Sequence, residues 1–221
     1  MTEPLVSCVD VAHTYGHGGT AVVAVHGTTC QVLRSTRVAV TGPSGSGKST
    51  LLHLLAGLDE PDGGSVHVLG ERMSHRSEAI RARLRAGAIG VLFQSGNLLP
   101  QLTVTGNVRL AQRLVRRARP PLVAGILFSL GLRSRADAYP GDLSGGELAR
   151  AGLAVALANN PVAILADEPT GELDATTESE VLGLLTDRAA RGAAILVASH
   201  SPAVAAAADR VITLYDGTVT V

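Results

Sequence analysis

The chain has 221 residues and no formal net charge, with 46% hydrophobic and 17% charged residues. This length and composition predict one globular domain with a sizeable core and exclude a disordered chain. With zero net charge, the chain lacks the excess positive charge that nonspecific nucleic-acid binding requires, so no nucleic-acid partner is expected.

No targeting or membrane-spanning segment is expected. The opening residues MTEPLVSCVD carry a glutamate and a proline where a signal peptide has an apolar run. Apolar stretches elsewhere are strand-length, well below the ~18 residues of a membrane span. The two cysteines, Cys8 and Cys30, are too few for a zinc site or a disulfide framework. We therefore expect a cytoplasmic protein with two ordinary thiols.

Strand-like and helical patterns alternate along most of the chain. The stretches with strand character are Val6 to Tyr15, Ala24 to Leu33, Val38 to Thr41, Ser65 to Leu69, Ala88 to Phe93, Val162 to Ala166, Ala193 to Ser199, Arg210 to Tyr215 and Thr218 to Val221. Those with helical character are Ser49 to Leu58, Ser77 to Ala86, Thr103 to Ala138 with a break at Pro120-Pro121, Ser144 to Ala158, Thr176 to Arg191 and Pro202 to Ala208. This order predicts a mainly parallel sheet covered on both faces, with the helical stretch 103–158 as a side lobe.

Lysine is almost absent from this chain. Of its 19 basic residues, 18 are arginine and one, Lys48, is lysine. Such a bias, with abundant Ala, Gly and Val, is typical of a GC-rich bacterial genome, in which arginine replaces lysine wherever any positive charge suffices. A compact ammonium differs from a guanidinium where the pocket is tight, so the surviving lysine marks a candidate site.

A glycine-rich loop that contains this lysine lies between a strand-like and a helical stretch. Its residues fit the pattern G-x-x-x-x-G-K-[ST] and are Gly42, Pro43, Ser44, Gly45, Ser46, Gly47, Lys48 and Ser49. In such a loop, backbone N–H groups and the start of the next helix, here including Thr50, surround phosphate oxygens. We expect Lys48 to reach the β- and γ-phosphates of a nucleotide and Ser49 to bind Mg²⁺.

Two acids end a later apolar strand. Val162 to Ala166 is followed by Asp167 and Glu168. Asp167 would hold Mg²⁺, directly or through water, and Glu168 would polarise the attacking water. Paired acids at a strand end also suit capping in a solvated loop, but the phosphate loop upstream favours the catalytic interpretation.

A phosphate loop and an acidic strand end also occur in small GTPases, kinases and RecA-like motors. The run Leu143-Ser144-Gly145-Gly146-Glu147 separates these classes, because it resembles the LSGGQ signature of ABC ATPases at the start of a helix. Small residues there bring backbone N–H groups and the Ser144 hydroxyl to a phosphate. The chain is therefore similar to ABC ATPases, and the similarity extends over its whole length.

Four further positions resemble elements of that family. Gln94 resembles the Q-loop glutamine that senses the γ-phosphate and Mg²⁺, and His200 resembles the switch histidine that contacts the γ-phosphate. Asp174 closes Gly171-Glu172-Leu173-Asp174, which resembles the D-loop that crosses between subunits. Tyr15 resembles the aromatic residue that stacks on adenine. Read singly, a strand-end histidine or tyrosine is more typical of surface hydrogen bonding or packing.

The resemblance implies a P-loop NTPase fold of the ABC ATPase type, with a mainly parallel sheet core, an N-terminal antiparallel β subdomain and a helical side lobe. It implies one domain over residues 1–221, with a helical subdomain of about 95–158 inserted in the core. It also implies Mg-dependent hydrolysis of ATP to ADP and phosphate. In this family the signature faces the γ-phosphate held by the other copy, so two ATP molecules would lie between the subunits of a homodimer.

Within the family, the stretches 93–100 and 166–174 look like the ATPases of lipoprotein release, macrolide and peptide export, and cell division (the LolD, MacB and FtsE types). That subgroup pairs with an integral membrane permease that has few spans and a large extracytoplasmic domain, often to transmit mechanical work. The resemblance thus implies a location on the inner face of the cell membrane, through the permease. We expect the stretch Gln94 to Val104 and the side lobe to dock it.

The sequence departs from the family pattern in at least two places, and two functions other than driving a permease remain open. Ser201 stands where an acid often follows the switch histidine, and the side lobe between Asn107 and Asp142 is shorter and more apolar than usual. An ABC ATPase of DNA repair or translation, without a membrane partner, is an alternative; tandem cassettes, coiled-coil insertions or basic tails would favour it, and the sequence has none. A regulatory module without turnover would normally lack Glu168 or His200.

Overall fold

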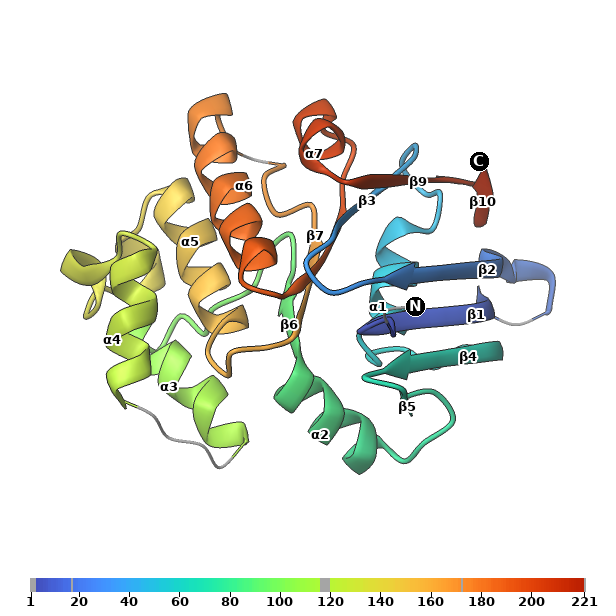
Figure 1. The fold of residues 1–221 in the computed structure, drawn as a ribbon, viewed down its shortest axis with the longest axis horizontal. Helices are drawn as coiled ribbons and strands as arrows, with labels where there is room; N and C mark the ends of the chain where they lie inside the picture. Colours follow the sequence, from blue (N-terminus) through green and yellow to red (C-terminus); the bar gives the residue numbers. More distant parts are fainter. Residues whose placement is uncertain (1–2, 17, 116–119, 172, 221) are drawn as a thin grey trace.

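The computed structural model describes every residue except 1–2, 17, 116–119, 172 and 221. In Figure 1 one sheet lies at the right of the view, most of the helices lie at the left, and strands of the second sheet run between them. The fold predicted from the sequence, a mainly parallel core with an antiparallel N-terminal sheet and a helical lobe, is confirmed.

The larger sheet has the strand order β10-β9-β3-β8-β7-β6, and every neighbouring pair is parallel except β9 with β10. Its strands are β3 (Arg37–Thr41), β6 (Ile89–Leu92), β7 (Ala163–Asp167), β8 (Ala194–Ala198), β9 (Arg210–Tyr215) and β10 (Thr218–Thr220). Successive residues of β7 enter different cores: Leu165 packs with α1 (Lys48–Leu55), and Ile164 packs with the helices of the opposite face. A sheet buried on both faces explains why these strands are continuous apolar runs.

The smaller sheet is antiparallel, in the order β2-β1-β4-β5. Its strands are β1 (Val6–Tyr15), β2 (Val22–Val32), β4 (Gly63–Val68) and the short β5 (Glu71–Arg72). Helix α1 packs against strands of both sheets, so the phosphate loop before it lies where the sheets meet. Cys8 and Cys30 are cross-strand partners in this sheet, buried and unoxidised, with their sulfur atoms 3.4 Å apart.

The helical lobe is built from α3 (Val104–Leu114), α4 (Pro120–Ser129) and α5 (Gly145–Ala156). Helix α4 begins at the predicted break, because proline suits a first helical position. The buried Asn107 side chain holds the loop before α3: its Oδ1 accepts from the Leu99 N–H at 2.7 Å, and its Nδ2 donates to three carbonyl groups of that loop. No helix in the described part of the chain is long and apolar enough to cross a membrane.

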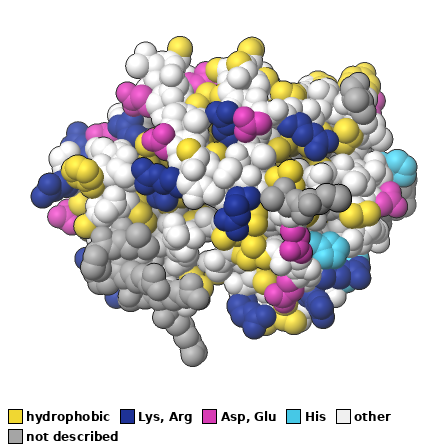
Figure 2. All heavy atoms as spheres, viewed as in Figure 1, with side chains coloured by type: hydrophobic (Ala, Val, Ile, Leu, Met, Phe, Trp, Pro, Cys, Tyr) yellow, Lys and Arg dark blue, Asp and Glu magenta, His cyan; other side chains and the backbone are white. Residues whose placement is uncertain are grey.

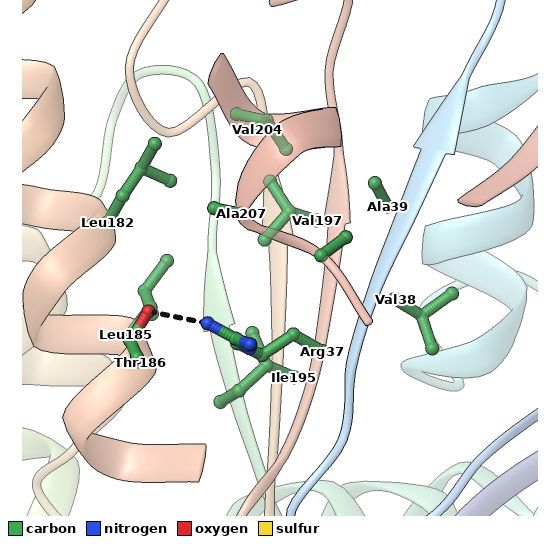
Figure 3. A pocket seen from close by; sticks show the side chains of 11 residues that line it. Arg37, Val38, Ala39, Leu182, Leu185, Thr186, Ile195, Val197, Val204 and Ala207 are labelled. Atoms are coloured by element: carbon green, nitrogen blue, oxygen red, sulfur yellow. Dashed lines mark hydrogen bonds between the residues drawn. The ribbon is translucent and has the colours of Figure 1, made fainter. Parts of the chain in front are cut away.

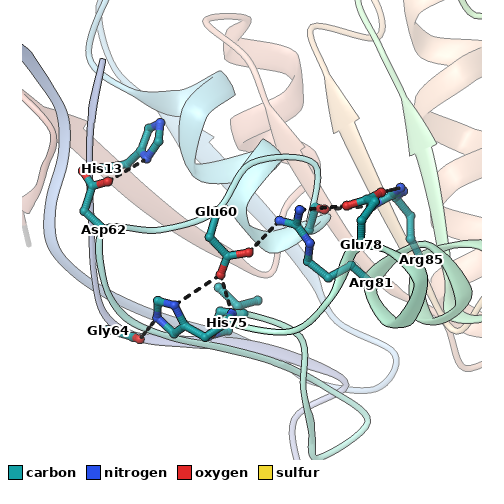
Figure 4. Close-up of polar contacts among 11 residues, drawn as sticks. His13, Glu60, Asp62, Gly64, His75, Glu78, Arg81 and Arg85 are labelled. Carbon is teal, nitrogen blue, oxygen red and sulfur yellow. Dashed lines mark hydrogen bonds and ion pairs between the residues drawn. The ribbon is translucent and has the colours of Figure 1, made fainter. Parts of the chain in front are cut away.

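The remaining helices are α2 (Glu78–Ala88), α6 (Ala175–Ala190) and α7 (Pro202–Ala207), and polar contacts hold α2 and α6 in place. Arg37 of β3 forms an ion pair with Asp209 at 2.7 Å. It also donates a hydrogen bond to the Thr186 hydroxyl of α6, as Figure 3 shows. The cavity beside it, of about 20 Å³, has room for about one water molecule. In Figure 4, Arg81 of α2 bridges Glu60 and Glu78, at 2.7 Å from each, and so ties α2 to the turn after α1.

The observed elements differ from the predicted ones mainly at their ends. The helix predicted to reach Leu58 stops at Leu55, because Gly57 takes a left-handed φ of 65°. Strand β5 was not predicted, since two residues carry no periodicity. On the face shown in Figure 2, basic and acidic side chains are interspersed.

Candidate nucleotide site

The phosphate loop connects β3 to α1 and is wedged between two other strands. A Cβ atom on Gly42 would lie 2.2 Å from the Leu214 carbonyl oxygen, and one on Gly47 would lie 2.1 Å from that of Ala24. Both positions also have a positive φ, of 146° and 97°. Only glycine fits at these two points, where the loop backbone packs directly against β9 and β2. Of the other predicted loop residues, Pro43, Ser44, Gly45 and Ser49 are exposed, while Ser46 and Thr50 are buried.

Lys48 starts α1 and is buried, with only 9% of its surface exposed. Its Nζ donates to the carbonyl oxygens of Gly42 and Pro43, at 2.9 and 3.0 Å. The ammonium therefore lies against the loop that precedes it. The Ser46 hydroxyl is buried nearby and has no hydrogen-bond partner among the described residues. A buried cation and an unpaired hydroxyl inside a glycine cradle fit a phosphate group.

The acids lie at the carboxyl end of the same sheet. Asp167 is the last residue of β7 and is 8% exposed, and its Oδ1 has no hydrogen-bond partner in the described part of the chain. In a parallel sheet the carboxyl ends of β3, β7 and β8 share one edge, so the phosphate loop, Asp167 and the residues after β8 converge there. The described residues form no cluster of three or more His, Cys, Asp or Glu that could hold a metal alone. Asp167, the Ser49 hydroxyl and the Gln94 amide are oxygen ligands of the kind Mg²⁺ uses together with substrate phosphates.

Glu168 is held by the segment that follows β8. The Ser199 hydroxyl donates to its Oε2 at 2.8 Å, the His200 N–H donates to its Oε1 at 3.2 Å, and His200 Nδ1 lies 2.9 Å from the same Oε1. The structure thus brings together Glu168 and His200, two residues predicted from distant parts of the sequence. Ser199, fully buried, was not predicted; its place directly after a buried strand is the only sequence signal that could have indicated it.

Gln94 follows β6 at the same sheet edge and is exposed. It lines a cavity of about 230 Å³ together with Glu168, Gly145 and Leu173. The Q-loop, the acidic strand end, the signature and the D-loop therefore meet around one space.

The signature starts α5 with a reciprocal cap. The Ser144 hydroxyl accepts from the Glu147 N–H at 3.3 Å, and the Ser144 N–H donates to Glu147 Oε2 at 2.9 Å. Arg135 donates to the other carboxylate oxygen at 2.8 Å. The hydrogen bond from the Ser144 backbone, followed by that from Arg135, lowers the pKa of Glu147 to about 2. The Glu147 carboxylate thus already has hydrogen-bond partners within its own chain. The N–H groups of Gly145 and Gly146 lie at the helix start, where an anion binds favourably.

The D-loop helix packs directly on the signature. Asp174 caps α6 through the N–H groups of Thr176 and Thr177, and the Thr177 hydroxyl, at 2.7 Å, lowers the pKa of Asp174. A Cβ atom on Gly146 would lie 2.6 Å from Thr177 Cγ2, so the two helix starts are in close contact. Glu172, also in the predicted D-loop, lies outside the described residues.

Tyr15 ends β1 and is 44% exposed. Its hydroxyl donates to Asp59 Oδ2 at 2.9 Å, and its ring meets His13 edge-on. Partial burial raises the pKa of Tyr15, which stays a neutral aromatic ring at neutral pH. The ring lies on the antiparallel sheet beside α1, and its stacking on a base remains a prediction.

Comparisons with known proteins agree with this geometry. Residues 25–171 match the family model described as ABC transporter. The lipoprotein-releasing system ATP-binding protein LolD of Xylella fastidiosa is 40% identical over 98% of this chain and 92% of its own length. The macrolide export ATP-binding/permease protein MacB of Chlorobium luteolum is 39% identical over 99% of this chain, which spans only 33% of that protein. Among solved structures, the dimeric ABC transporter cassette MJ0796 is similar with a TM-score of 0.91 and 33% identity, covering 98% of this chain and 97% of that one. A second structure of that cassette is a post-hydrolysis dimer bound to ADP and Pi, with the same TM-score of 0.91.

Proposed function

Since the chain belongs to the ABC transporter family of ATP-binding proteins and is an ATPase of that family, we propose that it powers a membrane permease that is a separate protein. The observation that carries this proposal is the convergence of Gln94, Glu168 and Gly145 on one cavity, next to the sheet edge that holds the phosphate loop. This arrangement supports roles for Gln94 as a sensor and Glu168 as a base beside a nucleotide held by the phosphate loop, with the signature on the same side of the chain.

Each residue of the site has a proposed role. Loop residues 42–50 bind the phosphates, with Lys48 on the β- and γ-phosphates. Ser49, Gln94 and Asp167 would hold Mg²⁺, which would supply positive charge to neutralise the phosphate oxygens. Glu168 accepts a proton from the attacking water, and His200 contacts the γ-phosphate and orients Glu168 through the 2.9 Å contact.

We propose that the working unit is a homodimer with two sandwiched ATP molecules. Gly145 and Gly146 present N–H groups, and Ser144 its hydroxyl, at the start of a 12-residue helix, while Glu147 caps the Ser144 N–H and forms an ion pair with Arg135. These donors would bind the γ-phosphate held by the partner copy, with Asp174 crossing near the interface. The solved relatives that are dimeric support this proposal.

The permease would dock in a largely apolar groove of about 730 Å³ lined by residues of α2, α3 and α5. Phe93, directly before Gln94, lines it, and so do Leu58, Leu114 and Val155. A short cytoplasmic helix of the permease seated there would sense nucleotide state through Gln94. The leucines predicted for docking do not line this groove: Leu99 is 49% exposed, and Leu98 and Leu102 are half-buried.

Similarity to LolD and MacB supports a complex of the lipoprotein-release or macrolide-export kind. We propose that its permease has few spans and a large extracytoplasmic domain. The chain would then lie on the inner face of the cell membrane. The test is to purify the chain with and without the permease encoded by the neighbouring gene and to measure ATP turnover. Co-purification and altered turnover are expected. A chain that neither binds the permease nor responds to it would favour the alternative of an ABC ATPase without a membrane partner.

A further inference from the structure

Glu178, in the first turn of α6, receives hydrogen bonds from two loops that meet at the candidate site. Its Oε1 accepts from the Thr170 hydroxyl at 2.9 Å and from the Ser201 hydroxyl at 2.7 Å. Thr170 follows Glu168 by two residues and is 3% exposed, and Ser201 directly follows His200. One carboxylate oxygen of Glu178 therefore joins the loop that follows Glu168 to the segment that contains His200.

A second path joins the same loops closer to the reacting groups. The Ser201 N–H donates to the Ser199 hydroxyl oxygen at 3.1 Å, and that hydroxyl donates to Glu168 Oε2 at 2.8 Å. A change in the position of Ser201 would thus move Ser199 and, through it, the Glu168 carboxylate. Hydrogen bonds arranged in series reinforce one another in a partly buried setting.

We propose that Glu178 is a positioning residue for ATP hydrolysis, which fixes Glu168 and His200 relative to each other by anchoring Thr170 and Ser201 to α6. This inference rests on the proposed roles of Glu168 and His200. Asp174 caps the same helix four residues earlier, in the D-loop. The position of the base is therefore tied to the element proposed to cross between the two subunits.

The anchor also explains the serine found at 201, where an acid was expected from the resemblance. Ser201 caps α7 by accepting from the Ala203 N–H at 3.2 Å, as an aspartate would, but its hydroxyl also donates to Glu178. An aspartate at 201 has no proton to donate at neutral pH, and two carboxylates would face each other. Serine at 201 and glutamate at 178 thus form a matched pair.

The first test compares steady-state ATP hydrolysis by variants of the full chain. Glu178→Ala removes both hydrogen bonds and should lower kcat by about 10- to 100-fold, the cost typical of a misplaced group, with KM for ATP unchanged. Glu178→Gln keeps a carbonyl acceptor at Oε1 and should restore most of kcat. The matched control is Glu180→Ala on the same helix, which removes an acid whose 3.0 Å partner is Arg150, outside both loops.

A second test does not depend on the folding of the alanine variant. Ser201→Asp should lower kcat, and adding Glu178→Gln to it should restore kcat, because the amide group of glutamine can donate to the new carboxylate. Glu168→Gln, measured in parallel, should abolish turnover.

The outcomes separate the two proposals. With Glu168→Gln inactive, any one of three results overturns the positioning role. Glu178→Ala could turn over ATP as fast as Glu180→Ala, or Glu178→Gln as slowly as Glu178→Ala. In the third, adding Glu178→Gln leaves the kcat of Ser201→Asp unchanged. Full turnover by Glu168→Gln would instead overturn the proposed base, and the inference with it.

Discussion

The backbone N–H of Gly217, in the turn between β9 and β10, donates a 3.1 Å hydrogen bond to the carbonyl oxygen of Ser46 in the phosphate loop. The carbonyl oxygen of Gly217 accepts from the His26 N–H at 2.8 Å and from the Thr28 hydroxyl at 3.3 Å. The last hairpin of the chain is thus fastened to β2 and supports the loop proposed to hold phosphate.

We predict that Gly217→Ala weakens ATP binding. Gly217 has a φ of 74°, and an added Cβ would lie 2.9 Å from the Ala24 carbonyl oxygen. The resulting strain of about 1–3 kcal/mol would move the turn away from Ser46 and loosen the loop. Titration with a fluorescent ATP analogue measures the affinity. Gly183→Ala in α6 is the control, because a Cβ there meets nothing within 4 Å. Equal affinities for both variants would show that the turn does not support the loop.

Lys48→Arg is expected to abolish nucleotide binding although it keeps the charge. The ammonium has two carbonyl contacts of 2.9 and 3.0 Å inside a loop closed by glycine backbone, and a planar guanidinium is too large for that space. The same binding titration checks this. Arg83→Lys is the reverse exchange on a side chain that is 73% exposed, and it should bind as the parent does. Parent-like ATP affinity in Lys48→Arg would refute the inference from lysine scarcity.

Glu168→Gln should trap an ATP-bound dimer. The amide keeps the shape of the carboxylate but cannot accept the proton of water, so the nucleotides would remain between the two copies. Light scattering should show a doubled mass with Mg-ATP and the monomer mass with ADP. A variant that remains monomeric at high protein and ATP concentrations would argue against the composite site.

Leu114→Asp should release the permease without affecting basal turnover. Leu114 lines the groove between α2, α3 and α5 and is 74% exposed, so a charge there opposes an apolar partner and leaves the core intact. Phe128→Asp is the matched control, since Phe128 is 69% exposed on α4, outside that groove. Leu99→Asp tests the neighbouring stretch predicted from the sequence. The measurement is co-purification with the permease encoded by the neighbouring gene. If Leu114→Asp retains the permease fully, the groove is not its docking site.

The signature cap should make stability depend on pH in acid. The pKa of Glu147 lies at about 2, below its ordinary value of 4.5, so the unfolded chain binds the proton more readily than the folded one. Its stabilising contribution is complete above pH 4.5 and is lost as the pH falls towards 2. Glu147→Gln removes the titrating group. The Tm difference between parent and variant should therefore shrink across this window, and added salt should reduce it at neutral pH. A difference that is independent of pH would contradict the prediction.

The sequence predicted the elements with strong periodicity and missed features that depend on contacts between distant loops. Strand β1 runs from Val6 to Tyr15 as expected, because buried apolar positions repeat along it. The phosphate loop, Asp167 and Glu168 were identified because their chemistry is local in sequence. Ser199 and Glu178 were not identified, since their partners lie 31 and 23 residues away and no periodic pattern records such hydrogen bonds.

The pairing of Cys8 with Cys30 has a practical consequence for studying the two-copy assembly. These are the only cysteines in the chain, and their exposed fractions are 1% and 4%. A maleimide dye applied to the folded protein would therefore react selectively with a cysteine introduced at an exposed position, with no need to replace the natural ones. Energy transfer between dyes on two copies would then follow their approach as ATP is added. Labelling of the natural pair would occur only when β1 and β2 separate, so the same reagent reports opening of the antiparallel sheet.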